Sequence, residues 1–291
     1  MCGVGSTCRF FTDAYDLFVI SIVKPMIAIL YYPQFNGKLP LTPDLWITGV
    51  ALAGALVGQV GFGLMGDYLG RRKVYLITLF LIIGATIGQA LAASTVKGVG
   101  IVTVLCFWRF LMGVGIGGDY PLSATIMCEY ANKKWRGSLL AAVFAAQGFG
   151  IISGAIVSLA VMACFQSAIK HTSILYLDYV WRIIIGLGCV PAVATIYLRA
   201  KLPETPRFTV DVAKDLTRAD KNMAVVYANR GDFQEPNTDP DKMDRISWRD
   251  LKAYLTSPSI LRNRNFWVLF GTASTWFFVD IAFYSQAGLK S

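Results

Sequence analysis

The chain has 291 residues, of which 55% are hydrophobic and 15% are charged, whereas soluble domains carry about 25% charged residues. This composition excludes an ordinary soluble globular protein and indicates one that lies in a lipid bilayer. The net charge of +9 could indicate nucleic-acid binding, but the lysines and arginines are concentrated in particular loops between apolar runs. That distribution is typical of membrane topology, so we expect a lipid bilayer and no nucleic acid as a partner.

Seven apolar runs are long enough to cross a bilayer, because a hydrocarbon layer of ~30 Å takes about 20 residues per helix. In chain order they are 10–32, 45–69, 74–93, 99–122, 137–164, 180–200 and 266–289. An earlier start of the first helix, near Gly3, is an alternative that would place its acidic residues deeper in the membrane. The sequence therefore predicts an all-α membrane protein.

Basic residues alternate between the loops. The loop after the second run holds Arg71, Arg72 and Lys73, and the loop after the fourth run holds Lys133, Lys134 and Arg136. Thirteen more basic residues lie at and after the end of the sixth run, from Arg199 to Arg264. The opposite loops hold only Lys38, Lys97, Lys170 and, at an edge, Arg182. Positive loops stay cytoplasmic, so we predict a cytoplasmic N-terminus and a cytoplasmic segment after the sixth helix.

The apolar runs divide the chain into three parts. Residues 1–202 are predicted to form an N-terminal six-helix bundle, and residues 203–265 form a polar cytoplasmic linker. Residues 266–291 hold a seventh transmembrane helix, the start of an incomplete C-terminal bundle.

Four acidic residues lie in or beside the predicted spans, at Asp13, Asp16, Asp119 and Asp280. A charge at mid-membrane costs at least ~2.5–3.5 kcal/mol, so such residues normally face the bundle interior or a wet cavity. Asp13 and Asp16 are three residues apart and therefore share one helix face. Each acid could instead only hydrogen-bond across helices, but four acids on three helices favour a functional site.

Polar and aromatic residues accompany these acids. Trp276, Asp280 and Tyr284 are spaced by four residues and form one helix stripe, for which helix packing or an interfacial aromatic belt is the alternative. Tyr120 and Gln147 add neutral hydrogen-bonding groups from the fourth and fifth helices. Pro121 permits a kink beside Asp119.

The stretch "GLMGDYLGRRK", residues 63–73, has a second set of informative spacings. Glycines 63 and 66 are expected to let two helices approach closely. The set Gly63, Asp67, Gly70, Arg71 and Arg72 resembles the signature loop of the major facilitator superfamily, and Arg109 in "RFLMGVGIGG" continues the resemblance. The segment "PETPR", residues 203–207, resembles a signature of sugar-porter-like members. A solvated loop with a few weak ion pairs is the alternative interpretation.

The stretches "FFTDAYDLF" and "GGDYPLSATIMCEYAN" resemble the fungal and plant inorganic phosphate:proton symporters of that superfamily. The resemblance covers nearly the whole chain and implies two six-helix halves with phosphate bound between them at mid-membrane. It implies proton-coupled phosphate transport by alternating access, in the plasma membrane. It further implies phosphate contacts at Tyr120, Gln147, Trp276, Asp280 and Tyr284, and proton handling at Asp13, Asp16 and Asp119.

Three features depart from that family. The chain ends just after the seventh helix, so we expect a truncated form of the parent carrier. Arg9 stands where the family usually has small or apolar residues. Lys24 lies within the first helix, where we interpret it as a lysine that snorkels toward the interface.

Two alternatives to phosphate transport stay open. The first is another major facilitator carrier, for an organic anion or a sugar. The second is a non-transporting membrane sensor or partner that associates with itself or with full-length transporters. No catalytic triad, metal-ligand spacing or nucleotide-binding loop is visible, so the sequence predicts no enzyme, no cofactor and no metal site.

Overall fold

A computed structural model describes residues 2–35, 37–93, 100–130, 136–200, 267–268, 270–275 and 278–279. The chain divides into two compact units, residues 1–234 and 235–291, and each is described by itself. The predicted linker 203–265 lies outside the described residues, as do its two predicted boundaries.

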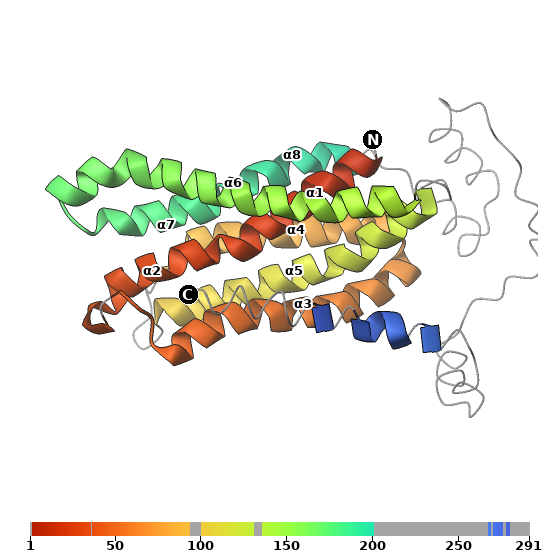
Figure 1. Cartoon of the computed structure of the whole chain (residues 1–291), viewed down its shortest axis with the longest axis horizontal. Helices are drawn as coiled ribbons and strands as arrows, with labels where there is room; N and C mark the ends of the chain where they lie inside the picture. The colour runs from red at the N-terminus through yellow and green to blue at the C-terminus, as the bar shows by residue number, and fades with distance from the viewer. Residues whose placement is uncertain are drawn as a thin grey trace, which may run out of the picture. The chain divides into compact units, whose positions relative to one another are not determined.

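The described part of the first unit is helical. Its elements are α1 (Cys2–Phe18), α2 (Ile20–Tyr31), the 3-10 helix η1 (Pro33–Phe35), α3 (Leu41–Leu69), α4 (Arg71–Ala90), α5 (Ile101–Tyr130), α6 (Arg136–His171), α7 (Tyr176–Gly186) and α8 (Cys189–Ala200). The helices run alongside one another, with α2 continuing α1 and α8 continuing α7 (Figure 1).

Six segments in the described part of the chain are long and apolar enough to cross a membrane. They are 7–31, 41–66, 71–90, 101–127, 137–171 and 176–197, which confirms the first six predicted spans. The earlier start of the first helix is also confirmed, because α1 begins at Cys2. In the second unit, helical residues 267–268, 270–275 and 278–279 fall inside the predicted seventh span.

The main boundary error concerns the fourth predicted helix, which was expected to end at residue 122. Helix α5 instead continues across Pro121 to Tyr130. Proline is tolerated inside membrane helices because neighbouring groups can satisfy the backbone carbonyl that it frees. Asp119 therefore lies well inside a continuous helix.

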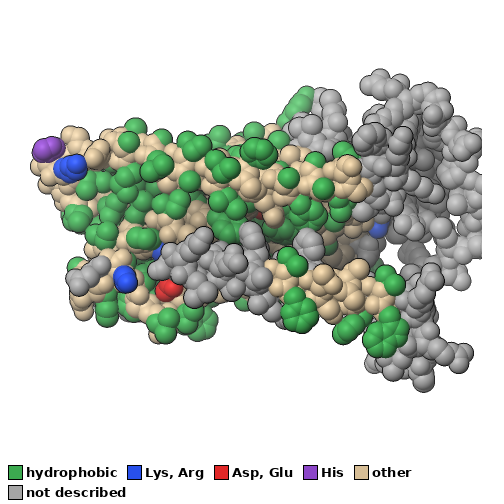
Figure 2. Space-filling view, in the orientation of Figure 1, with side chains coloured by type: hydrophobic (Ala, Val, Ile, Leu, Met, Phe, Trp, Pro, Cys, Tyr) green, Lys and Arg blue, Asp and Glu red, His purple; other side chains and the backbone are tan. Residues whose placement is uncertain are grey.

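The outer surface of the bundle is apolar. Figure 2 shows hydrophobic side chains spread along the visible face of the helices, with few charged ones. On α6, Phe149, Ile152, Ile156 and Leu159 are 57–72% exposed at helical spacing. Such a stripe is unfavourable in water, so it indicates a surface that contacts lipid or another apolar helix.

Glycines bring α3 and α5 into backbone contact. A Cβ atom added at Gly54 or Gly58 would meet backbone of Phe110 or Val114, and one added at Gly113 or Gly117 would meet the carbonyl groups of Ala51 or Ala55. Small residues allow this approach in membranes, where packing replaces the hydrophobic driving force.

The predicted close approach at Gly63 is wrong, because no atom in the described part of the chain lies within 4 Å of the place where its Cβ would be. At Gly66 an added Cβ would meet only the Leu122 side chain, at 2.7 Å. The close contact of α3 with α5 therefore lies further toward the N-terminus of α3 than the sequence motif suggested.

Candidate functional site: a buried charge network beside a polar pair

Four charged side chains from three helices meet inside the first unit. Arg9 and Asp13 come from α1, Asp119 from α5 and Arg199 from α8, and all four are at most 2% exposed. A guanidinium nitrogen of Arg9 contacts a carboxylate oxygen of Asp119, and its Nε lies 4.0 Å from Asp13. Arg199 Nη2 lies 3.7 Å from the other oxygen of Asp119. We call these four residues the buried charge network.

Helix α4 supplies the neutral groups around this network. The guanidinium carbon of Arg9 lies 4.1 Å from the ring centre of Tyr75, and that of Arg199 lies 4.7 Å from the same ring. Arg9 also donates a 3.1 Å hydrogen bond to Thr78, and Arg199 donates a 3.4 Å bond to the Tyr75 carbonyl. The aromatic ring thus stabilises both cations by cation–π contact.

The two positive and two negative charges of the network balance when all four groups are ionised. Balance matters because an isolated charge in a low-dielectric interior is strongly unfavourable. The structure therefore joins two of the predicted proton-handling residues, Asp13 and Asp119, through arginines that the sequence analysis did not assign to a site.

Asp16 occupies a different environment on the same helix. Its carboxylate is 3% exposed and accepts a 3.5 Å hydrogen bond from Thr86 of α4. Gly188, between α7 and α8, leaves room for it, because a Cβ at that position would meet an Asp16 oxygen. Among the described residues, no lysine or arginine nitrogen lies within 4.0 Å of this carboxylate.

Tyr120 and Gln147, two predicted phosphate contacts, lie together. Gln147 Nε2 on α6 donates a 2.6 Å hydrogen bond to the Tyr120 hydroxyl on α5, and both side chains are half-buried. Phe10 of α1 packs edge-on against Tyr120, with ring centres 5.0 Å apart. Phe10 directly follows Arg9 on α1. This helix therefore contacts the polar pair through Phe10 and belongs to the buried charge network through Arg9.

The other three predicted phosphate contacts, Trp276, Asp280 and Tyr284, lie outside the described residues. Their roles therefore stay predictions.

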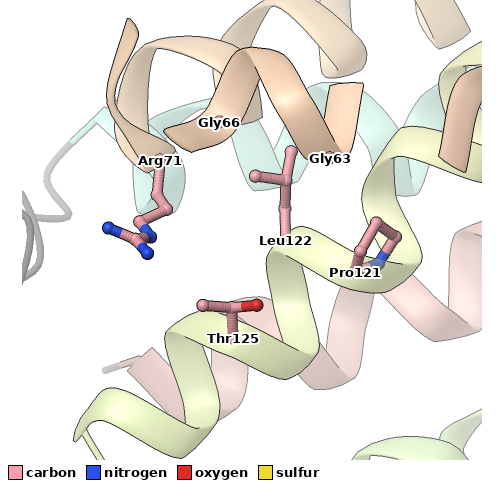
Figure 3. A pocket seen from close by; sticks show the side chains of 6 residues that line it. All are labelled: Gly63, Gly66, Arg71, Pro121, Leu122 and Thr125. Atoms are coloured by element: carbon pink, nitrogen blue, oxygen red, sulfur yellow. The ribbon is translucent and has the colours of Figure 1, made fainter. Parts of the chain in front are cut away.

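The predicted conformational motif lies at the turn between α3 and α4. Gly70 joins these helices with φ +95°, in the region that favours glycine. A cavity of ≈220 Å³ opens beside the turn and is lined by Gly63, Gly66, Arg71, Pro121, Leu122 and Thr125. In Figure 3, Leu122 points from α5 toward α3 between the two glycines. Arg72 follows Arg71 in the first turn of α4, and the side chain of Asp67 is outside the described part.

Arg109 does not join this motif in space. It is buried, and its Nε donates a 2.8 Å hydrogen bond to the carbonyl of Ile47. Ile47 and Gly63 are separated by ~24 Å along α3 at a helical rise of about 1.5 Å per residue. Arg109 therefore fixes α5 to the opposite end of α3.

Two interpretations of basic residues are corrected. Lys24 does not extend to the interface as a free snorkelling lysine, because its side chain is 6% exposed and its Nζ lies 2.7 Å from Asp44 at the start of α3. Arg199 was grouped with the loop charges, but it is buried in α8 and pairs with Asp119. In both cases the cation pairs with an acid on another helix.

The sequence contained a signal for Arg9. An arginine inside an apolar helix normally needs an anionic partner, and Asp13 follows at the i+4 position. No such local signal connects Arg9 or Arg199 to Asp119. Within the described ranges, no group of three or more His, Cys, Asp or Glu side chains is arranged to hold a metal ion.

Comparisons with known proteins match almost the whole chain. The family described as Sugar (and other) transporter matches residues 1–282. The chain is 46% identical over 291 residues to Probable inorganic phosphate transporter 1-12 of Oryza sativa subsp. japonica, covering 95% of this chain and 52% of the relative. It is 46% identical over 290 residues to Low affinity inorganic phosphate transporter 3 of Petunia hybrida, covering 95% and 53%.

The chain spans about half the length of the curated relatives it matches. These comparisons confirm the predicted resemblance to inorganic phosphate transporters. The relatives named here are plant proteins, so the fungal part of the predicted resemblance stays a prediction.

Solved structures show the same fold. The proton:xylose symporter XylE of the major facilitator superfamily, bound to 6-bromo-6-deoxy-D-glucose, matches with a TM-score of 0.65 at 21% identity, over 77% of this chain and 49% of that chain. The partially occluded inward open conformation of the xylose transporter XylE from E. coli matches with a TM-score of 0.64 at 21% identity, over 78% and 55%. The predicted all-α major facilitator fold is therefore confirmed.

Proposed function

Because the chain belongs to the Sugar (and other) transporter family, we propose that it forms the N-terminal half of a carrier that moves inorganic phosphate across a membrane together with protons. The observation that carries this proposal is the 46% identity, over 95% of the chain, to proteins named as inorganic phosphate transporters. The chain itself is a multi-pass integral membrane protein and not an enzyme.

The Tyr120–Gln147 pair is the proposed phosphate contact of this half. Its hydroxyl and amide are neutral hydrogen-bonding groups, which suit an anion that itself carries protons. The 2.6 Å hydrogen bond between them joins α5 to α6 at this point. The resemblance also implies phosphate contacts at Trp276, Asp280 and Tyr284, and these stay part of the proposal.

Alternating access supplies the proposed mechanism. Two six-helix halves rock about a mid-membrane site, and the α3–α4 turn with Gly63, Asp67, Gly70, Arg71 and Arg72 participates in the closure. Arg109 keeps α5 attached to the far end of α3. The candidates for proton coupling are Asp13, Asp16 and Asp119. We place the carrier in the plasma membrane with its N-terminus and the segment 203–265 on the cytoplasmic side.

The test is phosphate uptake by a chimera. This chain is followed by the part of rice inorganic phosphate transporter 1-1 that extends beyond the match, and the product is reconstituted in liposomes. We expect uptake of labelled phosphate that rises as external pH falls, is collapsed by a protonophore, and is competed by arsenate but not by sulfate. The 291-residue chain alone is expected to show no accumulation, because the proposed site lies between two halves.

A matched pair of variants locates the site within the chimera. Tyr120→Phe removes only the hydroxyl and should lower uptake about tenfold, since a hydrogen bond to a charged ligand contributes ~1.5–3 kcal/mol. Tyr179→Phe makes the same change on a tyrosine that is 59% exposed on α7 and should leave uptake unchanged. Uptake of xylose in place of phosphate, or equal inhibition by sulfate, would overturn the proposal.

A further inference from the structure

The three membrane acids of the first unit are not equivalent. Asp119 contacts both Arg9 and Arg199, and Asp13 lies 4.0 Å from Arg9, so two carboxylates share two guanidinium groups. Guanidinium groups keep their proton in proteins. Protonation of Asp13 or Asp119 in this arrangement would therefore leave a net positive charge inside the bundle.

Asp16 has no such constraint. Its carboxylate accepts a hydrogen bond from Thr86, a neutral hydroxyl that can accept a hydrogen bond from a carboxylic acid as readily as it donates one to a carboxylate. The titratable and charged groups that face Asp16 are Asp13 and Tyr15 on α1, Arg109 on α5 and Cys189 on α8. Arg109 is directed to the Ile47 carbonyl and does not come within ion-pair distance.

We propose that Asp16 is the residue of this half that takes up and releases the transported proton, while Arg9 and Arg199 hold Asp119 and Asp13 permanently ionised. Arg9 is then a positioning residue: its fixed positive charge balances the carboxylate of Asp119, which therefore carries no proton. This assignment rests on the proposed proton-coupled function and divides its three acids into one proton carrier and two fixed anions.

Burial supports this division. All five groups are at most 3% exposed, so solvent cannot stabilise any unbalanced charge among them. In such surroundings a carboxylate either contacts a cation or carries a proton. In this structure Asp13 and Asp119 lie beside guanidinium groups. Asp16 pairs with no described lysine or arginine, so it is the acid that carries a proton.

The experiment measures protonation directly in the 291-residue chain, in lipid nanodiscs and without phosphate. Infrared difference spectra between about pH 5 and about pH 9 report the C=O stretch of protonated carboxyl groups, which is absent from carboxylates. We expect one titrating band from a dehydrated carboxyl. It should disappear in Asp16→Asn and persist in Asp13→Asn and in Asp119→Asn.

Arginine variants test the second half of the proposal. Arg9→Gln should add a second titrating carboxyl band, because Asp119 loses a fixed cation, whereas Arg9→Lys keeps the cation and should add none. Arg199→Gln removes the other cation of Asp119 and should also add a band, so the test survives if Arg9→Gln does not fold. Circular dichroism checks the helix content of every variant.

Three results would overturn the assignment. They are a titrating band that is lost in Asp119→Asn rather than in Asp16→Asn, the absence of any titrating band in the unaltered chain, and folded arginine variants that gain no band. Because no transport is measured, these outcomes are independent of phosphate uptake, and a failure of the proposed function would appear only in the chimera.

Discussion

Two Arg–Asp clusters at opposite ends of the α7–α8 segment use the same chemistry in different surroundings. The buried charge network of Arg9, Asp13, Asp119 and Arg199 is closed to solvent. At the start of α7, Arg182 Nε lies 2.8 Å from Asp178, and their side chains are 20% and 29% exposed. Tyr31 and Trp181 also donate hydrogen bonds to Asp178, at 2.8 and 2.9 Å.

The difference shows that contact distance alone does not determine how much an ion pair contributes to the free energy of unfolding. Polar surroundings can replace a partner lost from the Asp178 cluster, and exposed pairs contribute only ~0–1 kcal/mol. Nothing can replace a partner lost from the buried network, because the remaining charge is left unpaired in a low dielectric. We therefore expect variants of the two clusters to differ in stability and in their response to pH and salt.

The largest effect is expected for Asp119→Asn. It leaves the guanidinium groups of Arg9 and Arg199, which both contact the Tyr75 ring, with one remaining acid of the network, Asp13. Breaking a buried pair in this way costs about 3–5 kcal/mol. Thermal unfolding in detergent should show a large fall in Tm, and a Tm equal to that of the unaltered chain would contradict the account.

A smaller effect is expected for Arg9→Gln, because a carboxylate left without its partner can take up a proton, whereas a guanidinium cannot lose one. We expect a loss of about 1–3 kcal/mol at neutral pH. The loss should shrink as pH falls, since protonation restores charge balance. Unfolding midpoints measured at several pH values check this, and Arg9→Lys is the control that keeps the charge.

Gly113→Ala tests whether the position of α5, which carries Asp119, depends on its contact with α3. The new Cβ would meet the carbonyl of Ala51, a backbone group that cannot move without shifting its helix. Overpacking of this kind costs about 1–3 kcal/mol. Gly84→Ala is the matched control and should not lower Tm, because no atom of the described residues lies within 4 Å of the new Cβ.

The smallest effect is expected for Asp178→Asn. The amide oxygen can still accept from Tyr31 and Trp181, and the lost ion pair is partly exposed, so the cost is about 0–1 kcal/mol. High salt should reduce the difference from the unaltered chain further, because salt screens exposed charges. A fall in Tm as large as that of Asp119→Asn would remove the distinction between the two clusters.

Much of the fold could be predicted from the sequence, because the apolar runs have the length that a bilayer requires. The interruptions at Val19 and around Gly188 were not predicted, since hydropathy averages over a window and does not register a local break. Glycine spacing predicted a close approach of two helices at Gly63 and Gly66 but did not identify the partner helix. It placed the contact at Gly63 instead of Gly54 and Gly58, because the sequence does not reveal which face of a helix meets a neighbour.

The site was predicted in part. Asp13, Asp16 and Asp119 stood out because acids are rare in apolar runs, and Tyr120 and Gln147 were named from the resemblance. Arg9 and Arg199 could not be assigned to Asp119, since 110 and 80 residues separate them from it along the chain. Arg199 also adjoins a basic segment, so its charge gave no indication that it is buried.

The most direct test of this difference between the clusters is a pair of double-mutant cycles on unfolding in mixed micelles. One cycle combines Arg9→Gln with Asp119→Asn, and the other combines Arg182→Gln with Asp178→Asn. We expect a coupling energy of about 2 kcal/mol or more for the buried pair, within the range for contacting residues, and less than about 1 kcal/mol for the partly exposed pair. Equal coupling energies in the two cycles would contradict the account.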